Sequence, residues 1–481
     1  MELDSTVIYT GAAGLADRQE EYDVTQHSNP VVVIGAGPVG LAAASHLAER
    51  GLDFVVLESG TGPAAAVGEW RHVRLFSPWR YDVDAAARRL LEPTGWDAPD
   101  PDALPTGGDL VDDYLTPLAK TPQLDGRIRY GADVVAVTRR GFDRLRTAGR
   151  DDAPYLIRLA GGEELLGSAV VDGSGTWRTP NVLGGSGIPA RGETAAAAAI
   201  AHALPDVLGA DRDRFAGRRT AVVGAGHSAA TTLLDLAELA EPGTEVVWVV
   251  RGASQARSYG GGADDELPAR GALGIRLRAL VESGRVELVA GFRTEAVREV
   301  GGRVELTAGD RTVVADVVVN ATGFRPDHQI VSELRLDLDP ILGSTRALAP
   351  LIDPNKHSCG TVPPHGVDEL GHPETGYYAI GAKSYGRAPT FLLATGYEQA
   401  RSVVAALAGD WEAARDVRLS LPETGVCSSS LVYGEEAGGG CCGPAAHATT
   451  EAPARGLPTG ISGGLLTVID QPAVTSSGCC G

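Results

Sequence analysis

Two short glycine-rich segments of this 481-residue chain have the residue types and spacing that bind phosphate groups. The first follows the pattern G-x-G-x-x-G over residues 35–40, between an apolar run at 31–34 and a helix-like pattern at 41–50. The first glycine permits a tight turn, the second lets a pyrophosphate approach the backbone, and the third lets helix and strand pack closely. The helix directs free N–H groups and its positive dipole end at the phosphates. The expected contacts are Gly35, Ala36, Gly37, Pro38 and Gly40.

The strand pattern after this helix ends in an acidic residue. An apolar run at 54–57 is followed by Glu58, which stands 23 residues after Gly35. A carboxylate at this point of a β-α-β unit accepts hydrogen bonds from both ribose hydroxyls and repels a 2′-phosphate. Because turn, helix, strand and acid stand in order, the unit predicts a dinucleotide site rather than a glycine turn that serves packing alone.

A second segment has the same pattern and a different charge at its end. Residues 224–229 read GAGHSA, after an apolar run at 221–223 and before a helix pattern at 230–239. The next strand, 246–250, ends in Arg251, whose guanidinium suits the 2′-phosphate of NADPH. The alternative is an arginine that is merely solvated, and the histidine is expected to line the turn rather than act as an acid or base. The expected contacts are Gly224, Gly226, His227, Ser228, Ala229 and Arg251.

Two such phosphate cradles imply two dinucleotides, FAD at the acidic one and NADPH at the basic one. The predicted fold is α/β, with two Rossmann-like dinucleotide-binding domains. The expected boundaries are a loose leader at 1–29, a discontinuous FAD domain at 30–212 and 316–420, an inserted NADPH domain at 213–315, and a flexible tail at 421–481. Gly, Ser, Ala, Thr and Pro dominate this tail, and its periodicity is lost, which predicts disorder.

Composition excludes some classes of partner. The formal net charge of −20 disfavours nucleic acids and anionic membrane surfaces. The N-terminus lacks the basic and apolar regions of a signal peptide, and the most apolar stretch, 31–44, is too short to span a bilayer. We therefore expect a soluble, cytoplasmic protein that binds a small-molecule substrate and neither nucleic acid nor membrane; its oligomeric state cannot be inferred from the sequence.

The whole arrangement resembles the two-dinucleotide-binding flavoproteins, and among them the flavin-containing monooxygenase-like branch. The segment 321–324 resembles the A-T-G-[FY] motif at which the chain returns to the FAD domain, and 170–177 resembles its earlier counterpart. Residues 68–70 resemble the stretch that approaches the isoalloxazine ring, and 376–381 resemble the strand that closes over the flavin. The FAD contacts that this resemblance implies are Gly68, Trp70, Thr322, Gly323 and Gly381.

The chain also resembles flavoproteins associated with arsenic-resistance gene clusters of high-GC bacteria. Two features depart from the better-known branches. The F-x-G-x-x-x-H fingerprint of authentic monooxygenases is missing before Gly224, and Ala382 replaces the Asp that is usual in disulfide reductases. Side chains that could line the flavin are Trp70, Arg74, Ser77 and Tyr385, and ordinary packing is an equally good interpretation of each.

The six cysteines are confined to the C-terminal part of the chain. None lies in the first 358 residues, so no C-x-x-C pair can stack on the flavin from the nucleotide-binding core. Two adjacent pairs in the tail, Cys441–Cys442 and Cys479–Cys480, have the soft thiolates that capture a metal or metalloid. The C-terminal pair also resembles the tail pairs of mercuric reductase and large thioredoxin reductases, and an inert tail is the remaining interpretation.

Three hypotheses follow from these features. The first is an FAD-dependent, NADPH-oxidising, monooxygenase-like enzyme that acts with O₂ on a small soft nucleophile, with a trivalent arsenical as a candidate. The second is an NADPH-dependent metalloid or disulfide reductase that uses the C-terminal cysteine pair as a shuttle to a thiol or metalloid acceptor. The third is a flavoprotein without catalytic activity that binds a metal or senses redox state.

Overall fold

The computed structural model describes residues 28–239, 241–260, 262, 265, 267–354, 362–389 and 391–419, all within one unit of the chain, Met1–Ser429. The leader and the tail expected at the two ends lie outside the described residues, apart from Ser28 and Asn29, and so do all six cysteines. The expectations for these segments therefore stay predictions.

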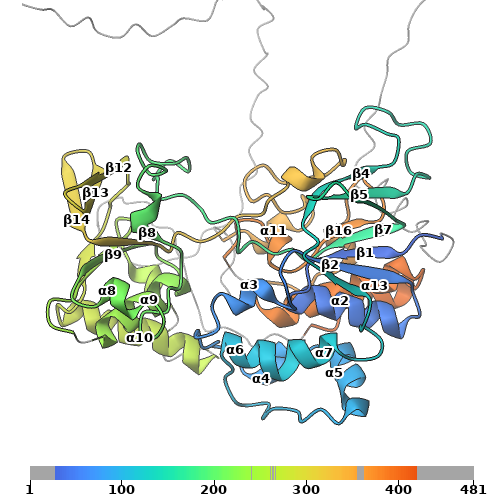
Figure 1. The fold of residues 1–481 in the computed structure, drawn as a ribbon, viewed down its shortest axis with the longest axis horizontal. Helices are drawn as coiled ribbons and strands as arrows, with labels where there is room; N and C mark the ends of the chain where they lie inside the picture. Colours follow the sequence, from blue (N-terminus) through green and yellow to red (C-terminus); the bar gives the residue numbers. More distant parts are fainter. Residues whose placement is uncertain are drawn as a thin grey trace, which may run out of the picture. The chain divides into compact units, whose positions relative to one another are not determined.

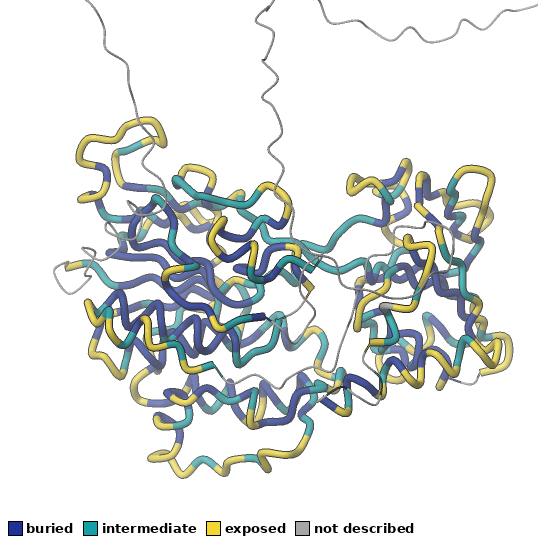
Figure 2. Tube along the Cα trace, turned by 180° about the vertical axis from the view of Figure 1, so that it is seen from behind, coloured by how far each residue is buried: buried dark blue, intermediate teal, exposed yellow. Residues whose placement is uncertain are grey.

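The first sheet has five parallel strands in the order β16-β7-β1-β2-β3 (Figure 1). Most of its strand positions are buried (Figure 2), as expected when both faces of a parallel sheet are covered. The glycine turn at 35–40 leaves this sheet from the end of its central strand. The strands are β1 Val31–Ile34, β2 Phe54–Glu58, β3 Ile128–Tyr130, β7 Ala169–Asp172 and β16 Tyr377–Ala379.

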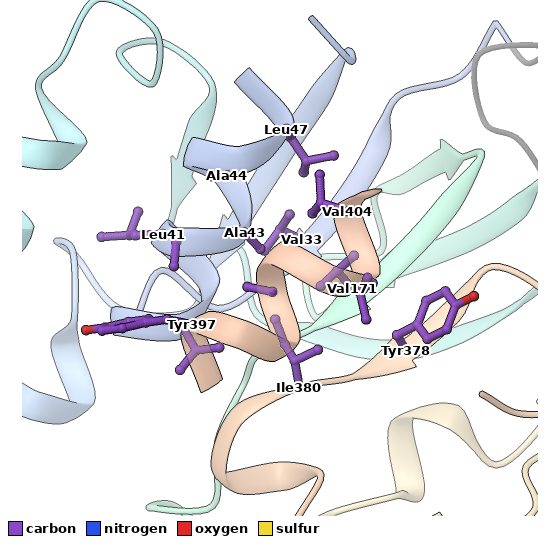
Figure 3. Close-up of a cluster of buried hydrophobic side chains, with 14 of the residues drawn as sticks. Val33, Leu41, Ala43, Ala44, Leu47, Val171, Tyr378, Ile380, Tyr397 and Val404 are labelled. Atoms are coloured by element: carbon purple, nitrogen blue, oxygen red, sulfur yellow. The ribbon is translucent and has the colours of Figure 1, made fainter. Parts of the chain in front are cut away.

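Two helices cover one face of this sheet, α2 (Pro38–Glu49) and α13 (Leu393–Leu407). In Figure 3, side chains of both helices gather with Val33 and Val171 from the strands and with Ile380, directly after β16. Alanines at 42–44 are fully buried, and their small size lets α2 lie close to the strands and to α13. Shorter helices extend this layer: α3 Ala65–Gly68, α4 Trp79–Asp82, α5 Ala85–Leu91, α6 Gly107–Asp109, α7 Thr116–Ala119, α11 Ala349–Ile352, α12 Val367–Leu370 and α14 Trp411–Arg415.

A small antiparallel sheet covers the opposite face. Its strands are β4 (Val134–Arg139), β5 (Tyr155–Leu159) and β6 (Glu164–Gly167). Alternation along β1 explains how one strand serves two cores: Val31 and Val33 pack with the helices, and Val32 and Ile34 pack with the small sheet.

The second sheet repeats this construction with five parallel strands in the order β11-β10-β9-β15-β8. One face packs on helices α9 and α10, and the other packs on a second antiparallel sheet, β12-β13-β14. The elements are β8 Ile200–Ala201, α8 Arg212–Phe215, β9 Arg219–Val223, α9 His227–Glu238, β10 Glu245–Val249, α10 Pro268–Glu282, β11 Glu287–Val289, β12 Ala296–Val300, β13 Arg303–Ala308, β14 Arg311–Ala315 and β15 Val317–Asn320. The predicted α/β fold with two dinucleotide-binding units is confirmed.

The boundaries expected for the second domain, 213–315, are too narrow for this sheet. Strand β15 pairs with β9 at its centre, and β8 pairs with β15 at its edge, so both belong to the second sheet. The chain passes between the two sheets along one short antiparallel contact, where Pro180 faces Phe324. The N–H of Asn181 donates to the Gly323 carbonyl at 2.8 Å, and the N–H of Arg325 donates to the Thr179 carbonyl at 3.0 Å.

Among the described helices, none combines the length and the apolar character needed to cross a lipid bilayer.

A buried ionic network ties the small sheet to the loop before β16. Glu374 accepts hydrogen bonds from Arg139 at 2.8 Å, from Arg150 at 2.9 Å and from the backbone N–H of Arg335 at 2.9 Å. The side chains of Arg139, Arg150 and Glu374 are at most 1% exposed. Burial alone raises the pKa of Glu374, but the bonds from Arg139 and from the Arg335 N–H outweigh it, so the pKa lies below its usual value.

Replacing Glu374 with Gln should lower the free energy of unfolding by about 3 kcal/mol, because two buried guanidinium groups lose their carboxylate. Urea unfolding of the FAD-loaded protein measures the loss. Since the pKa of Glu374 is depressed in the folded state, the loss should be complete at neutral pH and should shrink as the pH falls through that pKa. The control is Glu163→Gln, which removes an exposed ion pair with Arg129 and should leave the urea midpoint unchanged. Equal midpoints for Glu374→Gln and wild type would show that the network does not stabilise the fold.

Candidate functional site

The first glycine turn is shaped by two close backbone approaches. Gly35 has a φ of +94°, and a Cβ atom there would lie 2.9 Å from the Gly173 carbonyl oxygen. A Cβ atom at Gly40 would lie 2.0 Å from the Gly35 carbonyl oxygen. At Gly37, in contrast, a Cβ atom would meet nothing within 4 Å. The first and third glycines therefore allow the packing, and the second leaves its backbone accessible to a ligand.

The start of α2 is suited to binding an anion. Gly37 is its N-cap in extended conformation, Pro38 follows at the first helical position, and no side-chain hydrogen bond caps the first turn. Backbone N–H groups at an uncapped helix start, next to the positive dipole end, bind phosphate oxygens. These features fit the pyrophosphate of FAD.

Glu58 is held under this turn at the end of β2. One carboxylate oxygen accepts from the N–H of Ala36 at 2.8 Å, and the other accepts from the N–H of Gly60 at 2.7 Å. The residue is 7% exposed. A carboxylate has about four acceptor positions, so these two bonds orient Glu58 and leave capacity for ribose hydroxyls. The backbone of Ala64, at a φ of 52°, closes the loop by donating to the Ala36 carbonyl at 2.9 Å.

The second glycine turn has the same construction at the end of β9. Gly224 has a φ of +145°, and a Cβ atom there would lie 2.0 Å from the Ala321 carbonyl oxygen. Its own carbonyl accepts from the indole N–H of Trp248 at 2.7 Å. Gly226 is the N-cap of α9, without a side-chain cap and with open space beside it. Arg251 follows β10 and is exposed, so its guanidinium is accessible to a 2′-phosphate.

Thr322 and Gly323 lie beside the second glycine turn, and their contact with FAD stays a prediction. A Cβ atom at Gly224 would lie 3.2 Å from the backbone nitrogen of Thr322, whose hydroxyl donates to Asn320 at 2.6 Å. The corresponding neighbours of the first turn are Gly173 and Ser174, which were not predicted. The signal was in the sequence: DGSG at 172–175 follows β7 as NATG at 320–323 follows β15.

A buried ion pair at the ends of β7 and β16 was also missed. The ammonium group of Lys383 donates to Asp172 at 2.6 Å and to the Ser174 hydroxyl at 3.1 Å, and both charged side chains are at most 1% exposed. The hydroxyl of Tyr377 donates to the same Asp172 oxygen at 3.1 Å. Burial alone raises the pKa of Asp172, but the charge and hydrogen bond of Lys383 outweigh it and lower the pKa.

The proposed flavin-lining residues fall into two groups. Ser77 and Tyr385 are buried inside the protein: Ser77 donates to Asp82, whose pKa burial raises to about 7, and the Tyr385 ring packs on Phe391. These are packing contacts, and they do not support a flavin-lining role. Arg74 is exposed and donates to the Leu104 carbonyl at 2.6 Å.

Trp70 and the remaining glycines, Gly68 and Gly381, have different surroundings. Trp70 packs on Gly107, where a Cβ atom would lie 2.7 Å from its ring. Gly381, at a φ of +70°, lies against Val39 of α2, and Gly68 ends α3 with open space beside it. Gly381 and Gly68 are compatible with a flavin, and their contact with it stays a prediction.

The segment before α4 reaches the second glycine turn. The Phe76 ring lies 5.1 Å from the ring of His227, the first residue of α9, and the Arg270 guanidinium lies 5.8 Å from the Phe76 ring. Arg270 is held by a buried ion pair with Asp265 at 2.8 Å. His227 therefore lines the turn, as expected.

The described residues contain no cluster of three or more His, Cys, Asp or Glu side chains suited to a metal. The predicted soft-metal ligands, Cys441, Cys442, Cys479 and Cys480, lie outside them.

Known proteins match parts of this chain. A family model described as pyridine nucleotide-disulphide oxidoreductase matches residues 175–358, and one described as FAD dependent oxidoreductase matches residues 30–98. A curated relative, indole-3-pyruvate monooxygenase YUCCA1 of Oryza sativa subsp. japonica, is 32% identical over 207 residues, which is 43% of this chain and 44% of the relative. The match thus spans less than half of that relative's length.

Solved structures are similar over most of the described fold. The bacillithiol disulfide reductase Bdr of Bacillus cereus has a TM-score of 0.58 at 18% identity, covering 79% of this chain and 98% of its own. The cadaverine monooxygenase DfoA of Erwinia amylovora has a TM-score of 0.56 at 16% identity, covering 82% and 98%. At such identities the likeness shows the fold. The two family models support the expected enzyme class, a flavin-dependent oxidoreductase, with FAD and a pyridine nucleotide as cofactors.

Two single variants, Gly37→Ala and Gly40→Ala, should distinguish the glycine that binds the ligand from the glycine that allows the packing. Gly40→Ala should lower the free energy of unfolding by about 2 kcal/mol or more, because its Cβ would collide with the Gly35 carbonyl. Gly37→Ala should leave the apoprotein's stability unchanged and weaken FAD binding roughly ten-fold, because its Cβ points to the pyrophosphate site. Thermal unfolding of apoprotein and titration with FAD measure the two effects. Unchanged FAD affinity in Gly37→Ala would contradict this assignment of the first turn.

Replacing Arg251 with Glu should move the preference from NADPH toward NADH. A bidentate guanidinium–phosphate pair contributes about 1.5–3 kcal/mol, which is about 10- to 150-fold in affinity. Glutamate would repel the 2′-phosphate and accept a hydrogen bond from the 2′-hydroxyl of NADH. Flavin reduction with each nucleotide measures the preference. Equal use of NADH and NADPH by wild type, or loss of FAD from the variant, would contradict the assignment of the two turns.

Proposed function

We propose that this chain is an FAD-dependent, NADPH-oxidising monooxygenase-like enzyme that acts on a small soft nucleophile, with a trivalent arsenical as a candidate substrate. The observation that supports this most is the pair of uncapped glycine turns with opposite charges at the ribose positions. Glu58 is buried and already oriented, whereas Arg251 is exposed. The first suits the plain ribose of FAD, and the second suits a nucleotide that binds and leaves.

The two cofactors supply the redox chemistry when they are bound: NADPH gives hydride, and FAD passes the electrons on. The protein's part is binding and orientation. The first turns of α2 and α9 would hold the two pyrophosphates, Glu58 would fix the FAD ribose, and Arg251 would select the 2′-phosphate. The buried pair of Asp172 and Lys383 keeps the ends of β7 and β16 together next to the first turn.

In a monooxygenase reaction, one substrate, one O₂, one NADPH and one proton give the oxygenated substrate, water and NADP⁺. The reductase alternative consumes no O₂ and passes two electrons to a disulfide or metalloid. That alternative rests on cysteines outside the described residues, and no described contact favours it. The cytoplasmic location expected from the sequence stays a prediction, as does the arsenical.

Anaerobic mixing with NADPH should bleach the flavin of the purified protein. This tests flavin reduction, the step that the monooxygenase and the reductase alternative have in common. Adding O₂ together with arsenite or a monoalkyl arsenical should then consume one O₂ and one NADPH for each oxidised arsenical that forms, because a monooxygenase puts one oxygen atom into the substrate and reduces the other to water. This one-to-one-to-one stoichiometry supports oxygenation, whereas an oxidase would consume O₂ and NADPH without oxidising the arsenical.

Reoxidation by arsenical or disulfide without O₂ would show that oxygenation is wrong. The double variant Cys479→Ser/Cys480→Ser tests the reductase alternative. If the protein is such a reductase, this variant should lose turnover with the acceptor, whereas NADPH should still bleach its flavin. Bleaching followed by no turnover with any acceptor would favour the redox sensor.

A further inference from the structure

An open pocket of about 770 Å³ is lined from three directions. Residues 68–72 and 106–112 belong to the elements around the first sheet, residues 201–214 follow β8 of the second sheet, and Trp177 comes from the crossing between the sheets. The pocket therefore lies where the predicted flavin segment, 68–70, meets the second sheet. Nothing derived above assigns it a ligand.

An aromatic cluster forms one wall of this pocket. We use this name for Trp70, Trp177, His202 and Phe324. The Trp177 ring lies 4.4 Å from the His202 ring, 5.1 Å from the Phe324 ring and 6.4 Å from the Trp70 ring. Trp177 and His202 line the pocket directly. The indole N–H of Trp177 donates to Glu69 at 2.7 Å, which fixes the orientation of the ring and places a carboxylate at its edge.

The charges around the pocket are strongly unbalanced. Five carboxylates line it and only two guanidinium groups do, Arg71 and Arg214, which leaves an excess of three negative charges. Arg71 is already paired with Asp112 at 2.5 Å, and Arg214 donates to the Ala198 carbonyl at 3.2 Å. The other carboxylates are Glu69, which also pairs with the exposed Arg178 guanidinium at 3.9 Å, and Asp109, Asp206 and Asp211.

These carboxylates keep acceptor capacity toward the pocket. Asp109 accepts from the Thr106 N–H at 2.8 Å, and Asp206 accepts from the Ala210 N–H at 2.9 Å. Backbone N–H donors orient a carboxylate without cancelling its charge. In addition, the Nε2 atom of His72 is buried beside the pocket without a hydrogen-bond partner among the described residues. A buried polar atom of this kind needs a partner from a ligand or water.

The backbone of the pocket wall is strained at one point. Leu204 has a φ of 57°, in the left-handed region, and Ala64 is the other described non-glycine residue with a positive φ. A leucine in this region is strained and persists where the surrounding structure requires it. Leu204 lines the pocket next to His202, so the strained turn presents the aromatic wall.

We propose that this pocket binds a small organic molecule that carries a positive charge, such as a protonated or quaternary nitrogen. The cation lies against the faces of Trp177 and His202, with Glu69 at the ring edge, because an aromatic face and nearby carboxylates attract the same charge. The binding of this cation does not depend on the proposed function.

Binding of benzyltrimethylammonium to the purified full-length holoprotein tests the proposal, with benzyl alcohol and phenylacetate as neutral and anionic probes. Isothermal titration at one fixed ionic strength gives the affinities. The cation should bind about ten-fold more tightly than benzyl alcohol, and phenylacetate should bind more weakly than both. Equal affinity for the cation and the alcohol would overturn the proposal.

Three variants at two residues locate the binding, and each residue has a matched control. Glu69→Gln and Trp177→Leu should each weaken the cation about five-fold or more, and Trp177→Phe should retain part of the affinity because it keeps an aromatic face. The controls Glu163→Gln and Trp411→Leu change the same residue types outside the pocket and should bind as wild type does. If Trp177→Leu does not fold, Trp177→Phe and Glu69→Gln still decide, and wild-type affinity in both would overturn the assignment.

Flavin bleaching by NADPH is measured on the same samples. Bleaching without cation binding would leave the oxidoreductase function intact and show that the pocket proposal is wrong. Cation binding without bleaching would show that the proposed function is wrong and leave the pocket proposal standing.

Discussion

The rest of this structure depends on how closely α2 approaches the carboxyl ends of β1 and β7. A Cβ atom at Gly40 would overlap the Gly35 carbonyl, and one at Gly173 would lie 3.3 Å from the Gly40 backbone. Three glycines thus meet with no side chain between them. This contact sets the position of the helix start, and the helix start determines where a pyrophosphate can bind. The second sheet repeats the contact between the two strand ends, because a Cβ atom at Gly224 would lie 2.0 Å from the Ala321 carbonyl oxygen, whereas Ala229 stands at the position of the third glycine.

Charge is distributed around these contacts in three ways. Glu58 is buried and fixed by two backbone N–H groups, Asp172 and Lys383 form a buried ion pair without net charge, and Arg251 is exposed. A buried ion pair must be well satisfied by hydrogen bonds, because desolvation offsets most of its attraction. Asp172 meets this condition through Ser174 and Tyr377. The arrangement is consistent with a first site prepared for a resident cofactor and a second site prepared for an exchanging one.

The sequence predicted the elements and site residues that follow from local residue patterns. It did not predict the pairings between residues that lie far apart in the chain. Strand β1, the acid at Glu58 and the helices after both glycine turns were readable from local periodicity, although α2 begins at Pro38 and α9 at His227, about three residues earlier than the apolar patterns suggest. The edge strand β8 has only two residues, and its pairing with β15 across more than a hundred positions leaves no local pattern. The partnership of Asp172 with Lys383, 211 residues away, is likewise visible only in the folded chain.

The loop from α3 to α4 connects the two halves of the site. At one end Trp70 joins the aromatic cluster around Trp177, and at the other Phe76 packs against His227 at the start of α9. Between them, Arg74 donates to the Leu104 carbonyl and pairs with Thr106 in an isolated bridge, which anchors the loop on the segment before α6. One short stretch of chain therefore contacts the second glycine turn and reaches the pocket that Trp177 and His202 line. The two sites therefore share a structural element without sharing a residue.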